Sequence, residues 1–416
     1  GVSSKRVCVC TDDRDADEWN TAALGEGKRK KAVALVKRLR DRFAPGGLLH
    51  FGQGKWYPGE SLPRWAFNCY WRRDGEPIWT QSRLVANEHE PYGFTPADAG
   101  RFIRTLAEVL GVNPDHAIAG HEDAWYYMWR ERRLPVNVDP LKSNLEDPEE
   151  RARLAKVFES KLGSVVGYTL PIRREAEGWR SGPWFVRKEH LFLLPGDSPM
   201  GFRLPLDSLP WEAPGNRQFM EERDPFAPRG PLPRMQASGR RESTVASSAR
   251  NSRLTPAARQ VDPLVRTAIC VEPRNGVMHV FLPPARFLED YLNLVAAVEE
   301  TAAGLYMPVR IEGYTPPDDP RINHLSVTPD PGVIEVNIHP SHSWRECVDH
   351  TKIVYEEARL TRLASEKFML DGRHTGTGGG NHVVMGGPSP AESPFLRRPD
   401  LLKSFLGFWN NHPSLS

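Results

Sequence analysis

Cysteine is scarce in this chain of 416 residues, which contains five cysteines. Their number is odd, and their positions do not have the spacing of a disulfide framework or of a zinc site. Scattered cysteines of this kind are typical of reduced thiols, so we expect a cytoplasmic protein. No apolar run approaches the roughly 18 residues that span a bilayer, and no signal-peptide pattern opens the chain, so we expect no membrane contact.

An excess of one charge is also missing, because 55 Lys and Arg residues face 53 Asp and Glu residues. A dedicated nucleic-acid binder usually has a strong basic excess, and we therefore expect no nucleic-acid partner. Hydrophobic residues make up 39% and charged residues 26% of the chain, which is ordinary for a soluble globular protein. The length allows two or three domains, each with its own core.

One stretch of different composition divides the chain. Residues 213–261 are rich in Pro, Arg, Ser and Gly and poor in aliphatic residues, so this stretch cannot bury a core. We predict an N-terminal α/β region at 1–212, a linker or insertion at 213–261 and a final module at 262–416. The chain starts without Met and stops just as a predicted helix finishes, so we expect a fragment of a longer protein.

Periodicity and turn signals predict the individual elements. Helices are expected at residues 19–43, 95–110, 148–161, 287–303 and 343–369. Strands are expected at 48–51, 65–71, 77–79, 165–171, 190–194, 266–271, 277–282, 309–314 and 333–340, with a further strand from His382. Two hairpins are predicted, one joining 65–71 to 77–79 and one joining 266–271 to 277–282.

The strand at 333–340 has an unusual polar pattern. Glu335, Asn337 and His339 alternate with three aliphatic residues, and a strand sends alternate side chains to opposite faces. Asn is a poor strand former, so its presence needs a reason. We interpret this pattern as a polar active-site face, although a strand facing solvent could show the same alternation.

Glycines dominate the stretch 371–387, in which Gly378, Gly379 and Gly380 lead into the strand that starts with His382. Glycine lets the backbone approach a ligand and exposes successive amides to anions. The alternative is a flexible loop. A second glycine-containing segment, residues 52–60 (GQGKWYPGE), lacks the spacing of a phosphate-binding P-loop. Its Lys55 remains a candidate for binding an anionic group.

The order of these pieces resembles a known superfamily. A Glu-x-Asn strand after a Pro-Gly turn, a long helix, and then glycines before a His-bearing strand is similar to the glutamine synthetase and glutamate–cysteine ligase superfamily of ATP-dependent carboxylate–amine ligases. Residues 52–60, 203–211 (RLPLDSLPW) and the pieces within 309–387 resemble more closely a bacterial amidoligase family, whose members are often fused behind a transglutaminase-like domain. The closer resemblance covers nearly the whole chain from Asp12, and the wider one covers only the final third.

The resemblance implies an α+β fold, with a glutamine synthetase-like antiparallel sheet and helices in the C-terminal third, after an α/β N-terminal region. It also implies ATP- and Mg²⁺-dependent formation of an amide bond through an acyl phosphate. The substrates would be a carboxylate on a peptide or amino acid and an amine. A homo-oligomer and a transglutaminase-like domain in the full-length chain are further implied partners.

Site residues follow from the same resemblance. Glu335 and Glu312 are the expected metal ligands, since hard oxygen ligands suit Mg²⁺. The expected catalytic residues are His382, Asn337 and Arg321. The expected nucleotide- and phosphate-binding residues are Gly378, Gly379, Gly380, Arg373 and Lys55, and an arginine can hold phosphate through a forked contact.

Two departures from the family patterns leave other functions open. Residues 6–11 lack the carboxylate that the family carries on its first strand, and residues 324–328 lack the second glutamate of glutamine synthetases. A non-catalytic binding or scaffolding module that keeps the fold is one alternative. A metal-dependent amide hydrolase, which would not need ATP, is the other.

Overall fold

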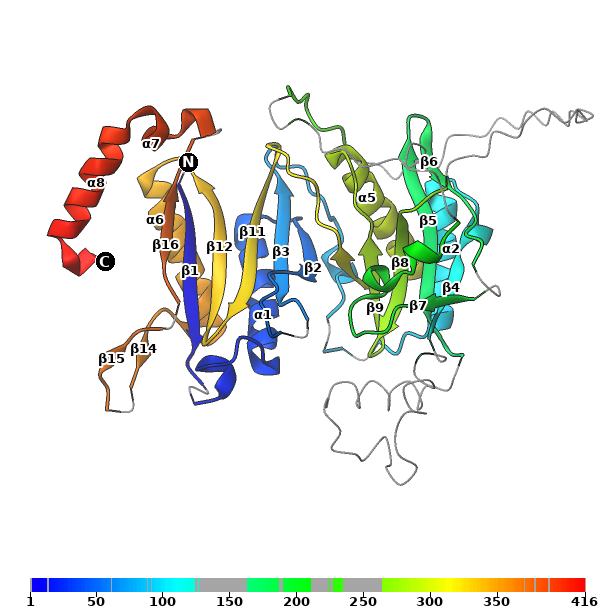
Figure 1. Cartoon of the computed structure of the whole chain (residues 1–416), viewed down its shortest axis with the longest axis horizontal. Helices are drawn as coiled ribbons and strands as arrows, with labels where there is room; N and C mark the ends of the chain where they lie inside the picture. The colour runs from blue at the N-terminus through cyan, green and yellow to red at the C-terminus, as the bar shows by residue number, and fades with distance from the viewer. Residues whose placement is uncertain are drawn as a thin grey trace, which may run out of the picture. The chain divides into compact units, whose positions relative to one another are not determined.

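The computed structural model describes residues 2–12, 15–60, 62–87, 89–90, 92–123, 126, 163–186, 190–210, 224, 227–234, 264–369, 371–377, 379–387 and 390–415. The chain has the expected α+β fold (Figure 1). It forms two compact units, unit 1 from Gly1–Pro77 and Ile322–Ser416 and unit 2 from Ile78–Arg321.

Unit 1 is built from both ends of the chain, so the two units do not follow the boundaries 1–212, 213–261 and 262–416. The predicted helix at 148–161 and most of the predicted linker lie outside the described residues.

The sheet of unit 1 has the order β13-β1-β12-β11-β3-β2, and β16 also pairs with β1. Its strands are β1 (Val2–Cys10), β2 (Leu48–Gln53), β3 (Trp65–Arg72), β11 (Ile322–Asp330), β12 (Val333–Ser341), β13 (Leu363–Ala364) and β16 (His382–Met385). Every one of these pairings is antiparallel. The predicted hairpin between 65–71 and 77–79 is wrong, because β3 pairs with β2 and β11 and residues 77–79 form no strand.

Two long helices, α1 (Glu26–Phe43) and α6 (Trp344–Leu360), lie on the same face of this sheet (Figure 1). The Arg6 side chain of β1 points to that face, because its Nη2 donates a hydrogen bond to Thr351 of α6 at 3.1 Å. Helix α6 starts at the cap Ser343, whose hydroxyl accepts from the Glu346 amide.

The helix predicted at 343–369 is too long, since α6 ends at Leu360. Arg362 has φ 62° and the chain then enters β13. The remaining elements of unit 1 are β14 (Lys367–Phe368), β15 (His374–Thr375), α7 (Pro394–Arg397) and α8 (Pro399–Asn411).

The sheet of unit 2 has the order β10-β9-β8-β5-β4-β7, with β6 paired to β5. Its strands are β4 (Ile118–Glu122), β5 (Val165–Glu175), β6 (Gly178–Ser181), β7 (Leu191–Leu193), β8 (Ala268–Arg274), β9 (Val277–Leu282) and β10 (Val309–Gly313). The pairs β9–β10 and β4–β7 are parallel, and the others are antiparallel. Among the described residues of this unit, the α-helices are α2 (Pro96–Leu110) and α5 (Leu288–Leu305).

The helix predicted at 95–110 and the hairpin predicted between 266–271 and 277–282 are confirmed in unit 2. Helix α2 begins with a capping box between Thr95 and Asp98 and ends at Gly111, which has φ 71°. The β8–β9 hairpin turns through Asn275 and Gly276, whose φ values of 50° and 75° are those of a two-residue hairpin turn.

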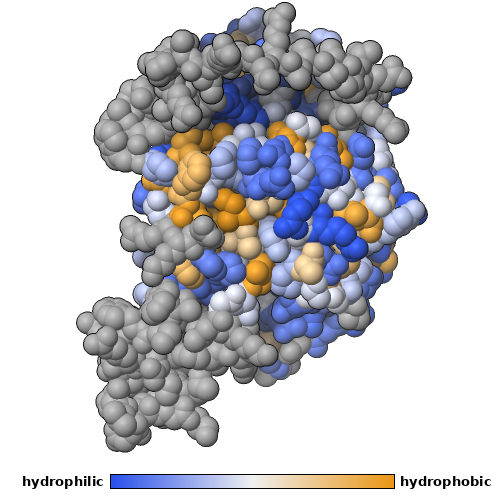
Figure 2. All heavy atoms as spheres, turned by 90° about the vertical axis from the view of Figure 1, so that its right-hand side faces the viewer, coloured by the Kyte–Doolittle hydropathy of each residue, from blue (hydrophilic) through white to orange (hydrophobic). Residues whose placement is uncertain are grey.

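The surface seen in Figure 2 carries small hydrophobic areas among hydrophilic ones. None of the described helices is long and apolar enough to cross a membrane.

Candidate functional site

A row of polar side chains crosses unit 1 on the face opposite α1 and α6, which we call the open face. Directly opposed residues of antiparallel strands project to the same side of a sheet. The register places six such residues in line across β2, β3, β11, β12, β1 and β16. This polar row consists of His50, Asn68, Ser326, Asn337, Lys5 and His382. Two of the predicted catalytic residues, Asn337 and His382, therefore flank Lys5, and both are exposed.

An ion pair lies beside this row. Lys5 stands opposite Asn337, and its Nζ reaches the diagonal neighbour Glu335, where it lies 2.5 Å from Oε1. The Lys5 side chain is 20% exposed and that of Glu335 11%. The predicted metal ligand Glu335 is thus on the open face, and the Lys5 ammonium neutralises its carboxylate.

The glycine-rich loop packs onto the same face. A Cβ built on Gly379 would lie 2.9 Å from Val7 and 3.0 Å from Val333, so the loop backbone rests on these two side chains. The Asn381 side chain accepts a hydrogen bond from the Val7 amide at 3.2 Å. Because Val7 pairs directly with Glu335, the loop lies next to the ion pair.

A close contact with His382 also explains why residue 380 is a glycine. A Cβ on Gly380 would lie 2.8 Å from Nε2 of His382, so the missing side chain leaves room for that imidazole. Gly378, the third predicted glycine, lies outside the described residues.

His339 is not on the open face, which corrects the expectation of three polar residues in one line. The register between β1 and β12 shifts between Val2 and Ser4, and such a bulge redirects the side chains that follow. The His339 ring packs on Phe43, Trp71 and His350, with centroid distances of 5.3, 4.8 and 4.4 Å. Burial, and secondly the neighbouring His350, lower the pKa of His339 to about 4.

The second predicted metal ligand, Glu312, belongs to unit 2. Its buried carboxylate accepts a hydrogen bond from Arg274, and Arg274 also lies 3.7 Å from Glu272. Burial raises the pKa of Glu312, and the Arg274 charge opposes this effect. In the structure Glu312 therefore belongs to a buried charge cluster.

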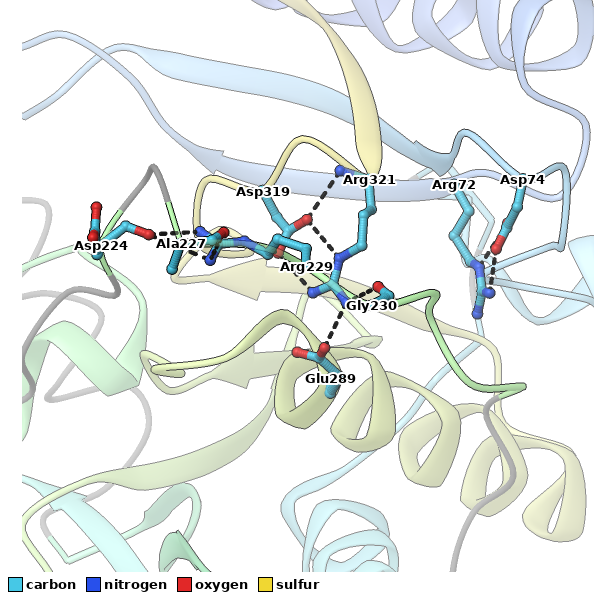
Figure 3. A network of polar contacts seen from close by, with 9 residues as sticks. All are labelled: Arg72, Asp74, Asp224, Ala227, Arg229, Gly230, Glu289, Asp319 and Arg321. Carbon is cyan, nitrogen blue, oxygen red and sulfur yellow. Dashed lines mark hydrogen bonds and ion pairs between the residues drawn. The ribbon is translucent and has the colours of Figure 1, made fainter. Parts of the chain in front are cut away.

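Arg321 is held in an extensive network (Figure 3). It donates to both carboxylate oxygens of Asp319 at 2.8 and 2.7 Å, to Glu289 at 2.7 Å and to the Gly230 carbonyl at 3.0 Å. The Asp319 hydrogen bonds are the main cause of a raised pKa for Arg321. With its donors engaged in this way, Arg321 joins three segments of unit 2 instead of pointing to a substrate.

The two remaining candidates are exposed. The Arg373 side chain is 82% exposed and pairs with Asp371 at 2.7 Å. Lys55 is exposed in the loop after β2, where Nε1 of the 67% exposed Trp56 donates to the Glu60 carbonyl at 2.6 Å.

Lys5 is the residue that sequence reasoning missed. Its strand shows no distinctive pattern, and its importance appears only when β1 lies between β12 and β16.

The side chains that can coordinate a metal ion decide which ligand the open face can bind. Across the part of the chain that the structure describes, no three His, Cys, Asp or Glu side chains form a group that could hold a metal ion. Mg²⁺ that binds together with phosphates usually takes only one or two protein carboxylates. Glu335 supplies one, next to the amide of Asn337, so the open face fits Mg²⁺ carried by a phosphate compound.

The family comparison gives one result. The model of the family described as "Putative amidoligase enzyme (DUF2126)" matches residues 5–416, which is nearly the whole chain. No curated protein and no solved structure matches.

Proposed function

Because the chain belongs to this amidoligase family, we propose that it is an ATP- and Mg²⁺-dependent carboxylate–amine ligase. The observation that carries this proposal is the open face of unit 1. It brings a carboxylate, an ammonium, an amide, an imidazole and a glycine-rich loop together on adjacent strands.

Each group has a part in the proposed reaction. Glu335 would hold the metal, and Lys5 and the backbone at Gly379 and Gly380 would hold phosphate oxygens. Asn337 would bind substrate by hydrogen bonds. Bound ATP would supply the phosphoryl group that activates the acid, since joining an acid and an amine in water needs such activation.

His382 is the proposed general base. An amine must lose a proton when it attacks the activated acid, and an imidazole is suited to accept it near neutral pH. Its ring lies beside Lys5 in the polar row and next to Gly380 in the loop, so it is close to the residues that would hold the acid.

The substrates are proposed by class only. The acid is a peptide or amino-acid carboxylate, and the amine is a second small molecule or peptide. A cytoplasmic location, a homo-oligomer and a transglutaminase-like domain elsewhere in the full-length protein remain parts of this proposal.

The first test is phosphate release from Mg·ATP that depends on an added amine, with hydroxylamine as a general acceptor for an activated acid. Glu335→Gln should abolish the release. The matched control is Glu26→Gln, which removes a carboxylate from an exposed ion pair with Lys30 and should have no effect.

A thermal melt tests binding separately from turnover. Nucleotide at about 100 times its dissociation constant should stabilise the folded chain by roughly 2.7 kcal/mol, and Glu335→Gln should remove this shift. If saturating Mg·ATP produces no shift in the unsubstituted chain, the ATP-dependent function is rejected. Amide hydrolysis without ATP would then point to the hydrolase, and the absence of any turnover would point to the scaffold.

A further inference from the structure

We propose that Lys5 and Glu335 form a self-neutralised pair that admits a metal ion and a phosphate only together. This inference rests on the proposed function, because it takes Mg²⁺ and a nucleotide as the ligands of the open face. It assigns to Lys5 the role of binding phosphate and controlling access to the metal ligand.

The geometry makes the two charges depend on each other. Lys5 Nζ and Glu335 Oε1 are 2.5 Å apart, and both side chains are largely covered. The residues that face them in the register are uncharged or imidazole groups: Lys5 faces Asn337 and His382, and Glu335 faces Val7 and Thr328. Among these described neighbours, each charge therefore has the other as its counter-ion.

A ligand of one sign is disfavoured by this arrangement. A metal ion that binds Glu335 must displace the Lys5 ammonium and repels it, while a phosphate that binds Lys5 leaves the Glu335 carboxylate unpaired. A partly buried charge without a partner is costly. Each ligand alone therefore binds against the ion pair.

A metal–phosphate compound removes both penalties. The cation takes the place of the ammonium at Glu335, and the phosphate takes the place of the carboxylate at Lys5, so charge stays balanced. The flanking loop at Gly379 lies directly beside the pair, where its backbone can approach a phosphate. The two ligands are thus coupled, and coupling is reciprocal for binding free energies.

Removing Lys5 should change the two kinds of binding in opposite directions. In Lys5→Met, Mn²⁺ alone should bind about tenfold more tightly, because Glu335 is released, whereas Mn²⁺ with the non-hydrolysable nucleotide AMP-PNP should bind about tenfold more weakly. Free Mn²⁺ is measured by electron paramagnetic resonance and nucleotide binding by calorimetry, so neither readout depends on turnover. Glu335→Gln should weaken both.

Two controls separate this role from a structural one. Lys30→Met removes a lysine from the exposed pair with Glu26 and should change neither affinity. Lys5→Arg keeps the charge and should restore the behaviour of the unsubstituted chain. Lys5→Gln, which removes the charge but keeps a polar side chain, replaces Lys5→Met if that variant does not fold.

The outcomes are distinct. Opposite shifts in Lys5→Met support the pair as the coupling element. Unchanged affinities, or a loss of both, overturn the inference but leave the ligase proposal standing. If Mn·AMP-PNP does not bind the unsubstituted chain, both proposals fall.

Discussion

Two carboxylate–cation pairs, one in each unit, show how the surroundings decide what the same chemistry can do. Glu335 and Lys5 meet on the open face of unit 1, beside an exposed amide and a glycine loop. Glu312 and Arg274 meet in unit 2, where the Glu312 side chain is 4% exposed, the Arg274 side chain is 31% exposed, and a second carboxylate, Glu272, lies close by.

The two pairs differ in whether a ligand can replace the cation that neutralises the carboxylate. Arginine holds a carboxylate through a planar fork, whereas lysine is a compact point charge on a flexible stem. Burial has also raised the pKa of Glu312. We infer that the pair in unit 2 supports the fold and that the pair in unit 1 is the one available to ligands.

The largest effect on stability is expected from Arg274→Met. It removes the hydrogen-bonded cation of the buried Glu312 and leaves the nearby charge of Arg310 in place. Breaking a buried pair typically costs about 3 to 5 kcal/mol, and the remaining Arg310 charge should bring the loss toward the lower end of this range. The pKa of Glu312 then rises further, so its folded-state pKa lies well above the unfolded value. The loss of unfolding free energy in Arg274→Met is therefore greatest at neutral pH. Stability returns as the pH falls and Glu312 takes up a proton. Urea unfolding across this pH range measures both effects.

Lys5→Met makes the comparison direct, since it also removes the cation from a carboxylate. Glu335 is only partly covered, so the loss should be smaller than in Arg274→Met, about 1 to 2 kcal/mol. Equal losses from Arg274→Met and Lys5→Met would mean that both pairs are structural. A larger loss from Lys5→Met would reverse the assignment.

A loss of stability that is smaller than in Arg274→Met, but depends steeply on pH, is expected from His339 on the helix-covered face of the unit 1 sheet. The pKa of His339 is lowered from 6.5 to about 4, so the folded protein resists protonation there while the unfolded chain accepts it. Stability from this group is present above the unfolded pKa and is lost as the pH falls toward the folded pKa, by about 3 kcal/mol in total. The charged and titratable groups that act on it are His350, Glu346, Arg73 and His324.

His339→Leu should therefore flatten the acid limb of the stability curve, measured by urea unfolding at several pH values. His342→Leu is the matched control, because His342 is exposed three residues away and should leave the curve unchanged. A curve that keeps its full slope in His339→Leu would assign the acid sensitivity to other groups.

Local features of this fold could be predicted from the sequence because neighbouring residues determine them. The capping box at Thr95, the turn at Asn275 and Gly276, and the start of α6 at Ser343 depend on residues within one turn of each other. The β-strands on either side of the Asn275 turn were predicted for the same reason.

Long-range pairing could not be predicted in this way. β1 pairs with β12 more than three hundred residues away, and nothing in either strand identifies the other. This pairing joins the two ends of the chain in unit 1, brings Lys5 to Glu335 and creates the bulge that turns His339 away. The structure brings Glu335, Asn337 and His382 to one face of the sheet, but the charge facing Glu335 was not foreseen.

A small effect on stability is expected at the glycine-rich loop, which packs onto the open face at Val7 and Val333. Gly379→Ala places a methyl group within 3.0 Å of Val7 and Val333, and overpacking of this kind costs about 1 to 2 kcal/mol if the loop stays in place. If the loop instead moves away, stability changes little, but the backbone leaves the site beside Glu335 and Mg·AMP-PNP binds more weakly. Gly376→Ala is the control, because a Cβ there meets nothing within 4 Å. Calorimetry and thermal melts of both variants distinguish these outcomes. A Gly379→Ala variant that matches the control in both measurements would show that the loop does not take part in the site, and the open face would then have to bind phosphate through Lys5 alone.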